Sequence, residues 1–156
     1  MRKPLLFLTI ILFLFNRTSN AQVYVGDSKK WVKTFVDQGF RSVKNSAIKT
    51  ETDSTYTFGL RGNFNPEDLY FKFDRSGTCY YQKWTFGCDT CYHKMLSIIL
   101  NKKRFKWKHS APNEYLSKTS KQLKLKEEVP GQAFTITQLY MREKDYQAIC
   151  DKASDN

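Results

Sequence analysis

Two cysteines separated by two residues, Cys88 and Cys91, have the clearest capacity for chemistry in this chain. The apolar residues that follow them recur at helical spacing, so the pair stands at the predicted start of a helix, directly after a strand-like segment that ends near Phe86. Backbone amides at a helix start stabilise a thiolate and lower the pKa of the first cysteine, which could then attack a disulfide. The spacing therefore indicates thiol–disulfide exchange as one candidate activity.

The order of strand, Cys-x-x-Cys and helix resembles the active site of thioredoxin, and Pro130 stands downstream at about the separation at which thioredoxin-like folds place a cis-proline. The resemblance implies a redox protein that uses Cys88 and Cys91. It stops there, because the segment before the motif predicts a β meander and not a βαβ unit. Asp89 would also oppose a thiolate electrostatically. Redox exchange is therefore the alternative to a structural role.

Structural disulfides are the favoured interpretation, because an even number of cysteines in an exported protein is typical of paired cysteines. The four are Cys79, Cys88, Cys91 and Cys150. Three pairings exist, and we favour Cys79 with either Cys88 or Cys91, and the remaining one with Cys150. A one-residue bulge at Gly77 would place Cys79 opposite Phe73 on the face of Phe71, whereas a two-residue turn would point it the other way.

Other site chemistry has less support. The grouping of Cys88, Cys91 and His93 lacks the second ligand pair of a zinc motif, and covalent haem attachment needs a histidine where Tyr92 stands. The two histidines, His93 and His109, would suit a small basic nuclease, but no catalytic motif accompanies them. We expect neither a metal nor a cofactor and favour a non-enzymatic protein.

The chain is strongly basic, with 26 lysines and arginines against 15 acidic residues and a formal net charge of +11. One segment interleaves cations with an aromatic residue, namely Lys102, Lys103, Arg104, Lys106, Trp107 and Lys108. Such patterns are typical of surfaces that contact nucleic acids, acidic polysaccharides, acidic proteins or anionic membranes. Alternatively, this segment is a helix end followed by an edge strand, in which Phe105 and Trp107 pack inward and the lysines face water.

Residues 1–21 predict a secretory signal peptide. Arg2 and Lys3 precede an apolar run from Leu5 to Phe15, and small residues lead to a cleavage point after Ala21. We therefore expect a secreted or periplasmic protein in which residues 22–156 form a single domain. No second long apolar run suggests a transmembrane anchor.

Periodicity predicts the elements of that domain. A helix capped by Asp27 should end near Gly39, and a second should run from Asp89 or Thr90 to about Arg104. Two-residue alternation predicts strands at 56–60, 69–73, 78–86 and 105–109, and a hairpin of 122–128 and 133–141. The hairpin turns at 129–132 with Pro and Gly in the central positions, which favours type II, and residues 142–153 are weakly helical.

These elements predict an α+β fold: an antiparallel meander plus a C-terminal β hairpin, with two to three helices packed on one face and no internal sequence repeat. The signal peptide ending, the lysine-rich and aromatic composition, and the hairpin sequence from Leu69 to Cys79 resemble small exported proteins of the Bacteroidota type. Those proteins are mostly uncharacterised. The resemblance implies an exported α+β domain and no catalytic residue.

Overall fold

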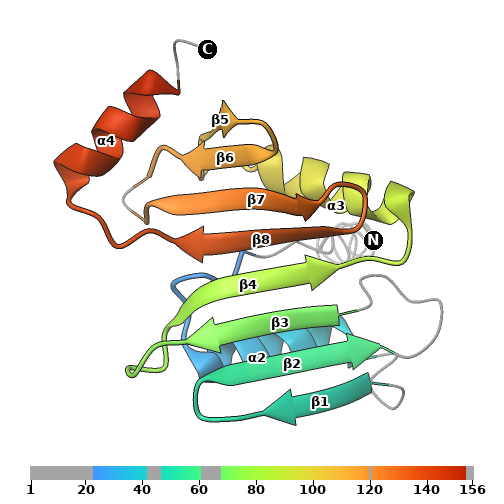
Figure 1. Cartoon of the computed structure of the whole chain (residues 1–156). Coiled ribbons are helices and arrows are strands. Elements are labelled where there is room, and N and C mark those ends of the chain that lie inside the picture. Colours follow the sequence, from blue (N-terminus) through green and yellow to red (C-terminus); the bar gives the residue numbers. More distant parts are fainter. Residues whose placement is uncertain (1–22, 42–46, 61–67, 120, 154–156) are drawn as a thin grey trace, which may run out of the picture.

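The computed structural model describes residues 23–41, 47–60, 68–119 and 121–153, which build one antiparallel sheet of eight strands and three helices (Figure 1). The strand order is β1-β2-β3-β4-β8-β7-β6-β5. The helices are α2 (Lys29–Gly39), α3 (Asp89–Leu100) and α4 (Glu143–Lys152). The strands are β1 (Ala47–Glu51), β2 (Thr55–Leu60), β3 (Asp68–Phe73), β4 (Cys79–Thr85), β5 (Trp107–Ala111), β6 (Glu114–Ser117), β7 (Leu123–Val129) and β8 (Ala133–Gln138). The α+β class is confirmed.

The fold consists of two similar halves. Each half is a helix followed by a four-stranded meander, α2 with β1 to β4 and α3 with β5 to β8, and the halves meet where β4 pairs with β8. The predicted C-terminal hairpin is thus the end of a second meander that also contains β5 and β6. We did not predict β6, because its four residues are too few to establish an alternating pattern.

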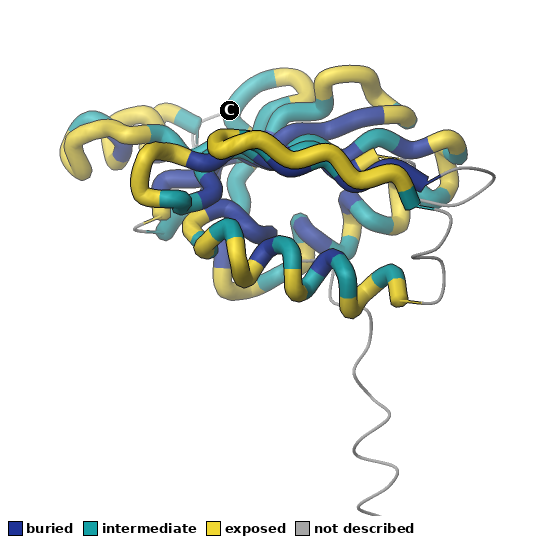
Figure 2. The backbone as a smooth tube through the Cα atoms, turned by 90° about the horizontal axis from the view of Figure 1, so that it is seen from below, coloured by how far each residue is buried: buried dark blue, intermediate teal, exposed yellow. Residues whose placement is uncertain are grey.

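The core fills the space between the sheet and the two helices α2 and α3, which lie on the same side (Figures 1 and 2). Both helices bury one stripe at helical spacing, with Val32 and Val36 in α2 and Tyr92, Leu96 and Ile99 in α3. At the centre, Phe134 of β8 stacks with Trp84 of β4 at a ring distance of 6.0 Å. The seam between the halves is therefore part of the core.

Helix α4 packs on the opposite face of the sheet, so the prediction of helices on one face holds only for α2 and α3. Side chains of paired antiparallel residues share a face, and Tyr115 of β6 pairs with Leu125 of the main core. The next residue, Leu116, must point the other way, and it packs with Tyr146 and Cys150 of α4. Alternation along β6 fixes this arrangement.

Several local predictions are confirmed and two are displaced. Cys79 pairs with Phe73 and is fully buried, as the bulged version of the β3–β4 turn predicts. The cap of α2 is Ser28 and not Asp27. Helix α3 ends at Leu100, earlier than predicted. The Lys102 amide donates to the carbonyl of Ile99, three residues back, where the α-helical pattern stops, and the Trp107 indole donates to the same carbonyl. The predicted signal peptide, residues 1–21, lies outside the described residues.

Candidate functional site at the start of helix α3

Cys88 and Cys91 are joined by a disulfide across the first turn of α3, with their Cα atoms 5.3 Å apart. Cys88 is the N-cap residue, with extended backbone angles, and its Sγ accepts a hydrogen bond from the backbone amide of Cys91 at 3.1 Å. The first sulfur therefore lies at the positive end of the helix dipole and within reach of an amide donor. Both features stabilise negative charge on sulfur when the disulfide is open.

The two sulfurs differ in their surroundings. Both cysteines are partly buried, but Cys91 packs against the main core, whereas Cys88 lines a surface groove of about 410 Å³. The opposite side of this groove is the β7–β8 turn, with Pro130, Gly131 and Gln132. An incoming sulfur can therefore approach Cys88 through the groove, which Cys91 does not line.

The β7–β8 turn is fixed in place beside the disulfide. The amide of Gln132 donates to the carbonyl of Val129 at 2.9 Å, and Phe86 donates its amide to the carbonyl of Gln132 at 2.7 Å. Gly131 has a φ of +82°, and the end of the exposed Asp89 side chain occupies the space beside it. The positive φ of the turn therefore favours glycine at this position.

Two acid contacts shape the charge around the disulfide. The Asp89 carboxylate lies 3.3 Å from Nε2 of His93, both largely exposed, so protonation of His93 would offset the negative charge beside Cys88. Deeper in the fold, the Tyr92 hydroxyl donates a hydrogen bond to the Glu127 carboxylate. Burial, followed by the bond to Glu127, raises the pKa of Tyr92, so the hydroxyl remains a donor that ties α3 to β7.

The favoured cysteine pairing is wrong, since Cys79 and Cys150 remain thiols in separate places. Cys79 lies in the main core, while Cys150 lies in the small cluster between α4 and β6. The alternation of side chains along β4 directs Cys79 into the core, where it does not pair with Cys88 or Cys91. Burial raises the pKa of Cys79 to about 12 and also raises that of Cys150, which makes both thiols poor nucleophiles.

The basic segment after α3 does not form one continuous surface. Trp107 packs against the main core, and Lys108, which pairs with Leu116, shares the face of α4. Lys102 is half-buried, and its pKa is lowered by burial and by Arg104. The exposed cations of this segment are Lys103, Arg104 and Lys106. The edge-strand alternative describes the arrangement, because β5 is the outermost strand of its half.

Of the two histidines, only His93 lies near this site, one turn along α3 from Asp89. His109 is on β5, with its ring 5.3 Å from that of Tyr115. Within the described part of the chain, no three histidine, cysteine or acidic side chains come together as a metal site requires. No helix among the described residues is long and apolar enough to cross a membrane.

The sequence predicted the Pro130 turn as a hairpin turn but did not predict that it would line the groove beside Cys88. The fold around it differs from that of thioredoxin, because all strand pairs in the described residues are antiparallel. No protein-family model, curated protein or solved structure matches this chain.

Proposed function

We propose that the chain is a thiol–disulfide exchange protein whose reactive group is the Cys88–Cys91 pair. The observation that carries this proposal is the position of the Cys88 sulfur, which caps α3, accepts the Cys91 amide and faces the groove beside the Pro130 turn. Export, which residues 1–21 predict, would place the pair among the thiols and disulfides of an oxidising compartment.

The exchange runs through Cys88. A thiolate of a partner dithiol attacks Sγ of Cys88, the bond between the two sulfurs of the pair breaks, and its electrons leave on Sγ of Cys91, which then takes up a proton. The second thiolate of the partner attacks the partner sulfur bound to Cys88 and releases Cys88 as a thiolate. The partner is oxidised to a disulfide, and the Cys88–Cys91 pair is reduced by two electrons.

A purely structural role would gain little from this pair. The disulfide closes a loop of only four residues, for which the chain-entropy relation gives roughly 2 kcal/mol. The residue at an N-cap position contributes most when it is Ser, Thr, Asp or Asn, and a serine at position 88 would cap α3 better than a sulfur does. The cysteine is therefore better explained by its chemistry than by its contribution to stability.

Trapping tests the proposal. In the reduced Cys91→Ser variant, Cys88 should form a stable mixed disulfide with oxidised glutathione, because the second sulfur that would release it is gone. The matched control, Cys88→Ser, keeps Cys91 of the pair, which packs against the core, and should form much less adduct; the buried Cys79 and Cys150 are common to both variants. Peptide mapping locates the adduct. Equal modification of both variants, or none in either, would contradict the proposal.

A second candidate function is binding of an acidic partner without chemistry. Lys103, Arg104 and Lys106 stand exposed and close in sequence after α3, in a chain with a net charge of +11. Attraction to an acidic protein, polysaccharide or anionic surface would weaken steeply with salt. Binding to heparin that is unaffected by replacing these three residues with glutamine would exclude this site.

A further inference from the structure

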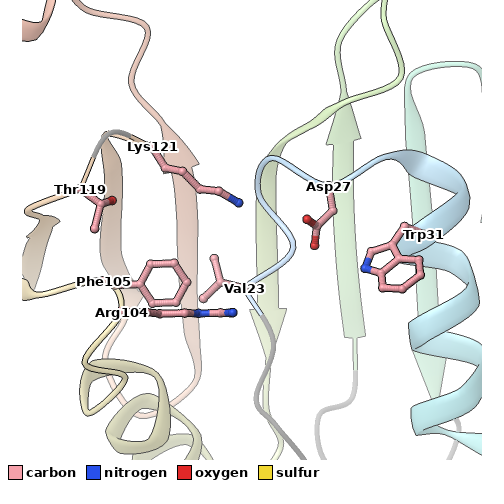
Figure 3. A pocket seen from close by; sticks show the side chains of 7 residues that line it. All are labelled: Val23, Asp27, Trp31, Arg104, Phe105, Thr119 and Lys121. Carbon is pink, nitrogen blue, oxygen red and sulfur yellow. The ribbon is translucent and has the colours of Figure 1, made fainter.

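A cleft of about 380 Å³ lies on another part of the molecule, lined by Val23, Asp27, Trp31, Arg104, Phe105, Thr119 and Lys121 (Figure 3). Its residues come from the segment before α2, the first turn of α2, the turn after α3 and the segment before β7. Figure 3 shows Asp27 and Trp31 on one side, with Arg104, Thr119 and Lys121 on the other. Its size is at the lower end of the range for small-molecule sites, roughly 300–1,000 Å³.

The carboxylate side of the cleft is held rigidly. The segment before α2 pairs with β4, since the Gly26 amide donates to the Cys79 carbonyl at 2.7 Å and the Cys79 amide donates to the Asp27 carbonyl at 2.8 Å. The Tyr24 amide also donates to the buried Gln82 side chain at 2.7 Å. Asp27 is therefore presented by backbone that is anchored to the sheet.

The cationic side is positioned by contacts of its own. The Arg104 guanidinium lies over the Phe105 ring at 4.6 Å. The Lys121 side chain crosses Gly26, where a Cβ would approach its Nζ to 2.9 Å, and Nζ donates to the carbonyl of Val25 at 3.3 Å. Gly26, with a φ of +93°, leaves the space that Lys121 occupies.

The Asp27 carboxylate faces Arg104 and Lys121 across the cleft. Among the described residues, Asp27 forms no ion pair with Arg104 or Lys121. Burial raises the pKa of its carboxyl group, and the two cations only partly oppose this shift. A partly buried carboxylate without a direct partner costs free energy that an ammonium group in the cleft would recover. Two cations and one carboxylate match a ligand that carries two carboxylates and one ammonium.

We propose that this cleft binds an acidic α-amino acid, with the ligand ammonium on Asp27 and its two carboxylates on Arg104 and Lys121. The Thr119 hydroxyl adds a donor on the cationic side, and Val23 and Phe105 provide an apolar wall for the ligand methylenes. Trp31, with an exposed fraction of 49%, closes the rim. This site is independent of the Cys88–Cys91 pair and does not require its redox activity.

Titration calorimetry of the purified protein with L-glutamate tests the site, with L-glutamine and glutarate as matched probes that lack one carboxylate charge or the ammonium. We expect saturable binding of L-glutamate and at least tenfold weaker binding of each of the other two. No saturation by L-glutamate at millimolar concentration, or equal binding of glutarate, would overturn the proposal.

Substitutions test which residue of the cleft binds the ammonium group of the ligand and which binds its side-chain carboxylate. Asp27→Asn should abolish the preference for L-glutamate over glutarate, and Lys121→Met should abolish the preference over L-glutamine. Asp53→Asn and Lys103→Met change the same charges at exposed positions that do not line the cleft and should leave both preferences unchanged. If either control removes a preference as fully as its cleft counterpart, binding follows overall charge and the proposal fails. Each variant is first checked for native circular dichroism.

Discussion

The helix that begins each half of the molecule is capped by a side chain that accepts a backbone amide, but the accepting atom differs between the halves. Helix α2 is capped by Ser28, whose hydroxyl oxygen accepts the amide of Trp31 at 3.3 Å. Helix α3 is capped by Cys88, whose sulfur accepts the amide of Cys91 at 3.1 Å. In both halves, the side chain of the cap residue accepts a hydrogen bond from the backbone amide of the residue three positions later. The position is equivalent, and only the second half places a sulfur there.

The two N-cap residues differ in how well they accept a hydrogen bond and in whether they can take part in covalent chemistry. A hydroxyl oxygen is the stronger acceptor and satisfies an amide that the helix leaves without a partner. Sulfur is the weaker acceptor but can break and form a covalent bond. The first half therefore shows a cap that serves folding alone, and the proposed exchange activity would explain why the second half has the weaker acceptor at the same position.

The largest expected effect comes from making the second cap like the first. Cys88→Ser should reduce the rate at which the protein accelerates insulin reduction by dithiothreitol to that of the reagent alone. Its stability should fall by only about 1 kcal/mol, because loss of roughly 2 kcal/mol from the disulfide is offset by a better cap. Insulin turbidity and urea unfolding measure the two quantities. An active serine variant would show that the sulfur has no chemical role.

The seam between the halves should tolerate substitution far less than their outer turns. Phe134 is fully buried and stacks with Trp84, so Phe134→Ala should destabilise the protein by about 3–5 kcal/mol through loss of contacts and a cavity. Val129→Ala, at a position 48% exposed, should cost less than about 0.5 kcal/mol. Urea unfolding measures both losses, and similar decreases in the free energy of unfolding for the two variants would contradict this description of the core.

The cysteines of the two environments should differ in their response to pH and to alkylating reagents. After mild reduction at pH 8, iodoacetamide should modify Cys88 well before Cys79, whose pKa burial raises to about 12. The unfolded Cys79 thiol ionises near pH 9 and the folded one does not, so rising pH favours the unfolded state. Stability should therefore fall between about pH 9 and 12, with a smaller slope in Cys79→Ala. Rapid native labelling of Cys79 would contradict its placement.

The smallest expected effect concerns the cap of the first half. Ser28→Ala removes the acceptor for the Trp31 amide and should lower the free energy of unfolding by about 1 kcal/mol. Asp27→Ala should not remove this cap, because Ser28 supplies it. Urea unfolding of Ser28→Ala at an unchanged m-value checks this prediction, and stability within 0.3 kcal/mol of the parent, roughly the usual additivity error, would contradict it.

Local patterns predicted much of the fold and the Cys88–Cys91 pair at a helix start, but not the long-range strand pairing or the cleft that contains Asp27. Alternating residues in β2, β3 and β4 and the Pro130–Gly131 turn were sufficient to predict those strands and the final hairpin. The pairing of β4 with β8 joins residues far apart in the sequence, and no local pattern encodes such a pairing. That pairing explains why a meander and a hairpin were predicted where the structure has one sheet.

The cysteine pairing failed for a similar reason. The sequence located Cys88 and Cys91 at a helix start but left the direction of Cys79 open. In the structure, β4 directs Cys79 into the core and α4 holds Cys150 on the opposite face of the sheet. Asp27 and Lys121 carried no sequence signal as a site, since only the three-dimensional structure brings them to one cleft.

A redox titration tests the central claim most directly. The protein is equilibrated in glutathione buffers of graded potential, free thiols are trapped with a mass-tagged maleimide, and near-ultraviolet circular dichroism reports the fold of each sample. We predict that the Cys88–Cys91 disulfide opens with a midpoint between about −270 and −120 mV, the range of redox-active pairs, while the fold persists. A midpoint below about −300 mV, typical of structural disulfides, or opening only on unfolding, would contradict the account.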